Sequence, residues 1–167
     1  MEKEITEVYC GNGRGKTTLA IGQALRASSQ GKSVIIIQIL KGNERRELDF
    51  LEELDQLDIK IFRFEKMETC YDQLNEEEQV EEERNILNGL NFARKVIATQ
   101  ECDFLVLDEI LGLLDKHIAT VDMVVGLLKQ KDESMHLILT GNRVDPGILD
   151  YVDSVTTITT LGREQNS

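Results

Sequence analysis

The sequence predicts an α/β protein in which a mostly parallel sheet carries helices on both of its faces. Short apolar runs alternate along the 167 residues with longer segments of helical periodicity. The run at 34–40, VIIIQIL, is apolar almost throughout, which is typical of a parallel strand buried on both faces. Strands that alternate with helices connect through right-handed crossovers and therefore lie parallel.

The first half of the chain shows the alternation clearly. In chain order the patterns predict a strand at 5–10, a helix at 17–29, a strand at 34–40, a helix at 44–54 and a strand at 59–64. The first of these helices has one apolar side, formed by Leu19, Ile21, Ala24 and Leu25, and the glycine at position 31 follows its end.

The second half continues the same order of elements. The patterns predict a helix at 75–99, a strand at 103–107, a helix at 110–130, a strand at 135–140, a short helix at 146–151 and a strand at 154–160. Pro146 suits the first turn of the short helix, because its missing N–H has no partner there in any case. The chain shows no internal repeat and no linker, so we expect residues 1–167 to form a single domain.

The long helix at 75–99 begins with a cluster of acidic residues, Glu76, Glu77, Glu78, Glu81, Glu82 and Glu83. Such a cluster could in principle hold a metal or a basic partner. We interpret it instead as a solvated helix start, because negative charge is favoured near the positive end of the helix dipole.

The amino-acid composition disfavours some classes of binding partner. The formal net charge is −12, which disfavours binding to nucleic acid or to anionic lipid headgroups. The N-terminus lacks the pattern of a signal peptide, and no apolar run reaches the ~20 residues that cross a bilayer. We therefore expect a cytoplasmic protein without nucleic-acid or membrane partners.

The cysteines and histidines show no metal-ligand spacing. Cys10, Cys70 and Cys102 are scattered and odd in number, which fits a reducing compartment and a packing role. His117 and His136 each lack a second ligand at helical spacing, so we expect both to be structural.

Residues 8–18, VYCGNGRGKTT, form a glycine-rich phosphate loop between the first strand and the first helix. Gly11, Gly13 and Gly15 allow positive φ and a close approach of backbone N–H groups to phosphate oxygens. Lys16 adds a cation and Thr17 a hydroxyl for a phosphate-bound Mg²⁺, so we predict both as catalytic residues. The predicted nucleotide-binding residues of the loop are Gly11, Asn12, Gly13, Arg14, Gly15, Lys16, Thr17 and Thr18. The alternative, a merely flexible turn, does not explain why strand, Gly-Lys-Thr and helix are in register.

The run LVLDE at 105–109 is an apolar strand that ends in two acids. In phosphate-loop proteins this arrangement places a carboxylate at the carboxyl edge of the sheet, beside the loop. We predict Thr17, Asp108 and Glu109 as Mg²⁺ ligands, with the choice between the two acids left open. Together the loop and this strand specify the fold class further, as a three-layer sandwich of the P-loop NTPase (RecA-like) type.

Five segments then carry a family resemblance: GNGRGKTT at 11–18, ALRA at 24–27, QILKG at 38–42, VLDEI at 106–110 and LTGN at 139–142. They resemble, in collinear order over nearly the whole chain, the P-loop corrinoid (cob(I)alamin) adenosyltransferases of the CobA/BtuR type. In that family, too, the position of Cys10 is not glycine.

The resemblance implies transfer of the 5′-deoxyadenosyl group of ATP to the cobalt of a reduced corrinoid, with Mg²⁺ as cofactor and triphosphate as the leaving group. It also implies a homodimer and an electron-donor flavoprotein as partner. Arg26 and Lys41 would help to hold nucleotide or substrate, although surface charges at these positions would look the same in the sequence.

The chain departs from the family pattern in three places. It has no tryptophan, whereas the family has an aromatic segment against the corrin ring after the third strand; here Phe64, Met67 or Tyr71 could take that place. Asn142 replaces the arginine of the Thr-Gly-Arg turn, with Arg143 one position later. The chain also ends soon after the last strand.

These departures leave two alternatives to the transferase. One is an ATP-binding regulatory or accessory protein that has lost the corrinoid site. The other is a small-molecule kinase, which needs a general base and an arginine-bearing lid. The nearby arginines, Arg45, Arg46 and Arg63, form no recognisable lid motif.

Overall fold

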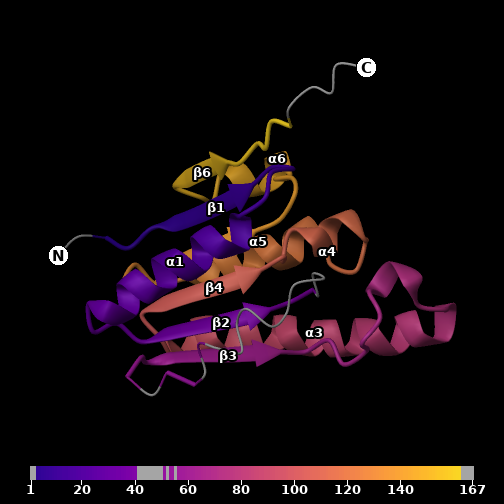
Figure 1. The fold of residues 1–167 in the computed structure, drawn as a ribbon, viewed down its shortest axis with the longest axis horizontal. Coiled ribbons are helices and arrows are strands. Elements are labelled where there is room, and N and C mark those ends of the chain that lie inside the picture. The colour runs from indigo at the N-terminus through magenta and orange to yellow at the C-terminus, as the bar shows by residue number, and fades with distance from the viewer. Residues whose placement is uncertain (1–2, 41–50, 52, 55, 163–167) are drawn as a thin grey trace.

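The structure is a computed structural model that describes residues 3–40, 51, 53, 54 and 56–162. Within these residues six parallel strands form one sheet in the order β3-β2-β4-β5-β1-β6 (Figure 1). The strands are β1 (Thr6–Cys10), β2 (Val34–Gln38), β3 (Ile59–Arg63), β4 (Phe104–Asp108), β5 (His136–Thr140) and β6 (Ser154–Thr157). The predicted parallel sheet is confirmed.

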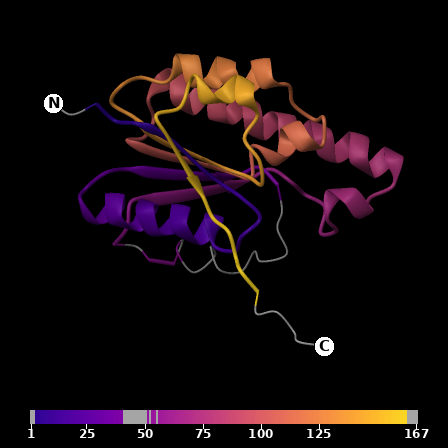
Figure 2. The same ribbon diagram turned by 90° about the horizontal axis from the view of Figure 1, so that it is seen from above.

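Helices cover both faces of the sheet, as Figure 2 shows. They are α1 (Lys16–Ser29), η1 (Tyr71–Gln73), α3 (Glu76–Thr99), α4 (Gly112–Asp115), α5 (Val121–Gln130) and α6 (Pro146–Leu149). The alanines of α1 pack on one face with Ile36 and Val106, whereas α3 and α5 pack on the other with Ile37 and Leu107. Successive residues of β2 and β4 thus enter opposite cores, which explains why both strands are apolar throughout.

The predicted helix at 110–130 is wrong in one respect, because it is two helices. His117 has φ 57°, a left-handed conformation that ends α4. The hydroxyl of Thr120 then accepts a hydrogen bond from the Met123 N–H at 3.3 Å and caps α5. Apolar periodicity continues across the break because both helices pack against the same core.

One further boundary differs from the prediction, and one predicted helix cannot be compared with the structure. The last strand ends at Thr157 rather than at 160, and residues 158–160 leave the sheet along the phosphate loop. The predicted helix at 44–54 lies almost entirely outside the described residues.

The acidic start of α3 is mostly solvated, with one exception. Asn75 and Glu78 form a capping box, each side chain accepting a hydrogen bond from the other's backbone N–H. Glu82, by contrast, is 1% exposed and accepts hydrogen bonds from the backbone N–H groups of Lys66 and Met67 at 2.8 and 2.6 Å. This carboxylate ties the segment after β3 to α3.

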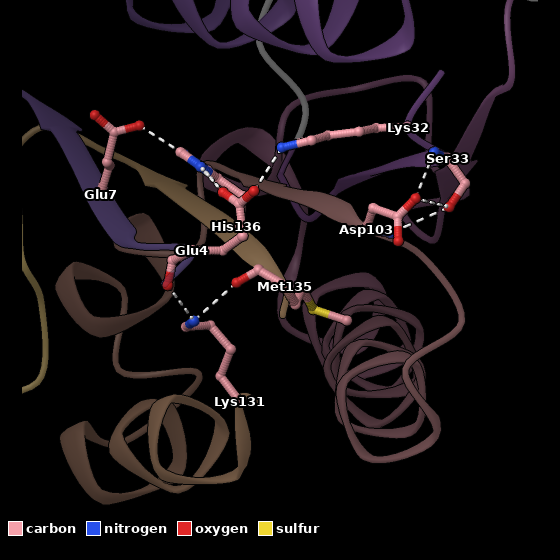
Figure 3. A network of polar contacts seen from close by, with 8 residues as sticks. All are labelled: Glu4, Glu7, Lys32, Ser33, Asp103, Lys131, Met135 and His136. Atoms are coloured by element: carbon pink, nitrogen blue, oxygen red, sulfur yellow. Dashed lines mark hydrogen bonds and ion pairs between the residues drawn. The ribbon is translucent and has the colours of Figure 1, made fainter. Parts of the chain in front are cut away.

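A polar network closes the amino edge of the sheet (Figure 3). The imidazole of His136 lies between the carboxylates of Glu4 and Glu7, at 3.2 and 2.7 Å, and stacks on the ring of Phe104. Lys32 forms an ion pair with Glu4 at 2.5 Å. The contacts of His136 join the N-terminal segment to β5, and the ion pair of Lys32 joins the same segment to the turn after α1.

None of the helices in the described part of the chain has the length and apolar composition needed to cross a bilayer.

Candidate functional site

The loop between β1 and α1 ends in a helix start without a cap. Gly15 is the N-cap residue, with φ 101°, and it has no side chain to accept a hydrogen bond. The first-turn N–H groups of α1 have no partner inside the helix, and no described residue accepts a hydrogen bond from them. No acidic residue lies in this turn. The helix dipole adds positive potential there, so this start suits an anion such as phosphate.

Gly11 and Gly13 accommodate the chain's own C-terminal segment. A Cβ on Gly11 would lie 2.3 Å from the carbonyl oxygen of Ile158, and one on Gly13 would lie 2.6 Å from it. The Gly13 N–H donates to this oxygen at 2.9 Å, and the Arg14 N–H donates to the Thr160 hydroxyl at 2.8 Å. Both glycines are predicted to contact phosphate, and in the structure their small size is also required by the carbonyl oxygen of Ile158.

Lys16 reaches from α1 to the turn that follows β5. Its Nζ donates to the Gly11 carbonyl at 2.5 Å and to Asn142 Oδ1 at 2.7 Å, and the residue is only 9% exposed. The carbonyl of Asn142 also accepts a hydrogen bond from the Gly11 N–H at 2.9 Å. Asn142 therefore holds both the loop and its lysine.

Asp108 lies beside Thr17, as predicted. Asp108 Oδ1 accepts hydrogen bonds from the hydroxyls of Thr17, at 2.9 Å, and Thr140, at 2.8 Å. The residue is 4% exposed, and burial raises the pKa of its carboxyl against the opposing effect of these hydroxyls and of the Gln38 amide. A buried carboxylate of this kind is stabilised by a nearby cation.

Glu109 follows Asp108 in a strained conformation. Its φ is 61°, a left-handed value that is unusual for a residue other than glycine, and its N–H donates to the Thr140 hydroxyl at 2.7 Å. Burial and the neighbouring charge of Asp108 both raise the pKa of the Glu109 carboxyl. Two acids with raised pKa values thus lie at the end of β4.

These donors fit Mg²⁺ bound together with a nucleotide. The described residues contain no group of three or more His, Cys, Asp and Glu side chains that could hold a metal. Mg²⁺ in nucleotide sites commonly takes only one or two protein oxygens, with phosphates and water as the remaining ligands. Thr17, Asp108 and Glu109 offer a hydroxyl, a buried carboxylate and a half-buried carboxylate for such a site.

Some predicted site residues do not contact Lys16, Thr17 or Asp108, or lie outside the described residues. Arg26 lies in the last turn of α1, about 15 Å from Lys16 along the axis at 1.5 Å per residue. At that position it complements the negative end of the helix dipole. Asn12, Arg14 and Thr18 are exposed on or beside the loop. Lys41 and the kinase-lid candidates Arg45 and Arg46 lie outside the described residues.

Three residues at the site were not predicted as site residues, namely Gln38, Thr140 and Asn142. Gln38 ends β2 and Thr140 ends β5, while Asn142 lies in the turn beyond. A polar residue directly after an apolar run was the available signal, because the carboxyl ends of parallel strands meet at one edge of the sheet.

The chain is similar to known proteins over most of its length. The sequence profile of the family described as "ATP:corrinoid adenosyltransferase BtuR/CobO/CobP" matches residues 2–165. The chain is 30% identical to the corrinoid adenosyltransferase of Escherichia coli K12 over 160 residues, which cover 93% of this chain and 76% of that protein. It is 28% identical over 158 residues to the corrinoid adenosyltransferase CobA of Salmonella typhimurium LT2, with the same two coverages.

Among solved structures, a KaiC-like protein from Pyrococcus horikoshii has a similar fold. The TM-score is 0.62 at 19% identity, over 97% of this chain and 76% of that one. This likeness and the parallel strand order confirm the predicted α/β sandwich, with a parallel sheet between layers of helices.

Proposed function

Because this chain belongs to the ATP:corrinoid adenosyltransferase family, we propose that it transfers the 5′-deoxyadenosyl group of ATP to the cobalt of a reduced corrinoid. The observation that supports the nucleotide half of this proposal is the uncapped start of α1. This helix start lies at the same sheet edge as Lys16 and the hydrogen-bonded pair Thr17 and Asp108.

The reaction is a displacement at the C5′ carbon of ATP. Reduced cobalt supplies the electron pair for the new Co–C bond, the C5′–O bond breaks, and triphosphate leaves with the electrons of that bond. The leaving group carries several negative charges, so groups already in place around it lower the barrier. The first-turn N–H groups of α1 and the Nζ of Lys16 are these groups.

Lys16 changes partners before this step, when ATP binds. In the structure its Nζ contacts two neutral oxygens, those of Gly11 and Asn142. The triphosphate offers charged oxygens, to which an ammonium group forms stronger hydrogen bonds. We expect the lysine to turn from the loop to the phosphates as ATP binds.

Mg²⁺ supplies further neutralisation of the phosphate charge when it is bound. Thr17 and at least one of Asp108 and Glu109 would hold it. The Thr17 hydroxyl donates its hydrogen to Asp108, which leaves the lone pairs of its oxygen available to a cation. Since the reaction transfers no phosphoryl group and activates no water, the site needs no general base.

A spectroscopic assay tests the proposal. Protein, Mg-ATP and chemically reduced cobalamin are mixed, and the corrinoid absorption spectrum is followed with time. Formation of the light-sensitive Co–C product supports the transferase. ATP binding by calorimetry without any spectral change would overturn it and would favour the regulatory or accessory protein.

Two partner proposals rest on the family resemblance alone. One is a homodimer, which analytical ultracentrifugation of the purified protein tests. The other is an electron-donor flavoprotein, which would replace the chemical reductant in the assay. A monomer at assay concentration would contradict the first, and the absence of product with a reduced flavoprotein would contradict the second.

A further inference from the structure

Four neighbouring strands end in polar residues that lie next to one another in one row. In the order of the sheet these are Arg63 on β3, Gln38 on β2, Asp108 on β4 and Thr140 on β5. The strand register pairs Gln38 with both Arg63 and Asp108. Arg63 Nε donates to Gln38 Oε1 at 2.7 Å. Because paired residues of parallel strands present their side chains on the same face, the register places the Gln38 amide beside the Asp108 carboxyl, whose pKa it lowers.

The orientation of the Gln38 amide follows from its two neighbours. The Arg63 guanidinium has only donors, so it must face the amide oxygen. The amide nitrogen then faces Asp108, whose carboxylate only accepts. The reverse orientation would place two donors together on one side and two oxygens together on the other.

Asp108 is thereby held by donors from three elements. Thr17 lies on α1, Thr140 ends β5 and Gln38 ends β2. The two hydroxyls bind the same oxygen, Oδ1, and Thr140 is itself fixed because it accepts the Glu109 N–H. Removing any of these donors leaves a buried carboxylate with fewer partners, and the carboxylate can then rotate away from Thr17.

We propose that Gln38 is a positioning residue that holds Asp108 against the Thr17 hydroxyl, and that Arg63 acts on the nucleotide site through Gln38. The inference rests on the nucleotide-binding half of the proposed function and requires no corrinoid. It implies that the end of β3, three strands from β5, contributes to the Mg²⁺-dependent part of ATP binding.

Calorimetry on Gln38→Met tests the role of the amide. ATP is titrated into the full-length protein once with Mg²⁺ and once with a chelator, and the ratio of the two affinities measures the Mg²⁺-dependent gain. Methionine has a similar length and no strong donor, so we expect this gain to fall about tenfold, as for the loss of a hydrogen bond to a charged group. Affinity for ATP without Mg²⁺ should change by less than about twofold. An unchanged gain would overturn the proposal.

Two variants separate this effect from a general disturbance. Gln38→Glu keeps the acceptor for Arg63 and replaces only the donor to Asp108 by an oxygen, so it should reduce the gain at least as much. Gln130→Met makes the same chemical change at the exposed end of α5 and should leave the gain unaltered. Thermal unfolding of each variant shows that it is folded.

A double-mutant cycle tests whether Arg63 acts through Gln38. In the wild type, Arg63→Ala should lower the Mg²⁺-dependent gain about threefold, and in Gln38→Met it should have no further effect. Equal effects of Arg63→Ala in both backgrounds would show a direct action on the nucleotide and would overturn this part. If the wild type binds Mg-ATP but forms no Co–C product, the transferase proposal fails while these binding data still decide the role of Gln38.

Discussion

The two edges of the sheet have opposite character, although the same six strands form both. At the amino edge the charged groups satisfy one another: His136 lies between Glu4 and Glu7, and Lys32 pairs with Glu4 (Figure 3). At the carboxyl edge the start of α1 has no cap, and Asp108 is a buried acid with a raised pKa. Glu109 there has a left-handed backbone.

The amino edge therefore contributes mainly to stability, and the carboxyl edge is the place for ligand binding. Groups that have found partners within the chain contribute to folding and leave nothing for a ligand. The carboxyl edge of a parallel sheet is where ligands bind in folds of this kind. Its strained and under-satisfied groups cost stability in the free protein, and a bound anion or cation recovers that cost.

The largest expected effect is a difference in the rate of adenosyl transfer between variants of two lysines, one at each edge of the sheet. Lys16→Ala should lower the rate of adenosyl transfer by about 10²-fold or more, because the charge of the leaving triphosphate loses a positioned donor. Lys32→Ala removes a partly exposed ion pair and should lower the free energy of unfolding by at most about 1 kcal/mol, with an unchanged rate. Initial rates and urea unfolding measure both. Equal rate losses in the two variants would show that the site is not at the phosphate loop.

The next largest effect concerns Thr140, whose hydroxyl serves both Asp108 and the Glu109 N–H. Thr140→Val has the same shape but leaves both groups short of a partner, so it should cost about 1–3 kcal/mol of unfolding free energy. It should also weaken Mg-ATP binding. Thr140→Ser keeps the hydroxyl and should restore most of both losses; failure of this rescue would show that packing, and not the hydrogen bonds, matters at this position.

The pH dependence of stability should have opposite signs for an acid at each edge of the sheet. The pKa of Glu4 lies below its usual 4.5, chiefly because of its hydrogen bond to Lys32. Its contribution to stability is therefore complete above pH 4.5 and is lost as the pH falls through the lower folded value. Burial raises the pKa of Asp108 above its usual 3.8, so stability falls as the pH rises from 3.8 through the folded value.

At neutral pH, Glu4→Gln should therefore lower the free energy of unfolding and Asp108→Asn should raise it. Asp108→Asn should at the same time weaken Mg-ATP binding. Urea unfolding of both variants between about pH 3 and 8 checks the two slopes. A loss of stability in Asp108→Asn at neutral pH would mean that its hydrogen bonds outweigh the desolvation of its charge.

The sequence was sufficient for the fold because local patterns and tertiary packing agree in most of it. Strand β2 is β-branched and buried on both faces, and α1 begins at Lys16, directly after Gly15. The failures occur where long-range contacts override local pattern. His117 interrupts a periodic apolar stretch by one backbone angle, which leaves no trace in periodicity.

The site shows the same division. Thr17 and Asp108 could be predicted as neighbours because loop and strand each carry a recognisable motif. Gln38 was not predicted as a site residue because its position beside Asp108 depends on the strand order, which places β2 next to β4. The burial of Glu82 was not predicted because its sequence neighbours are solvated glutamates. Only its hydrogen bonds from the Lys66 and Met67 N–H groups, which come from a distant segment, set it apart.

The smallest expected effect compares two exposed hydroxyls, one at each edge. At the carboxyl edge the Thr160 hydroxyl accepts the Arg14 N–H, and at the amino edge the Ser33 hydroxyl accepts the Asp103 N–H at 3.1 Å. Water can replace either bond, so each deletion should cost no more than about 1 kcal/mol of unfolding free energy. Thr160→Val should in addition weaken ATP binding about twofold to threefold, because the phosphate loop becomes less constrained. Ser33→Ala should leave ATP affinity unchanged, and calorimetry that finds equal ATP affinities for the two variants would show that residues 158–160 do not constrain the loop.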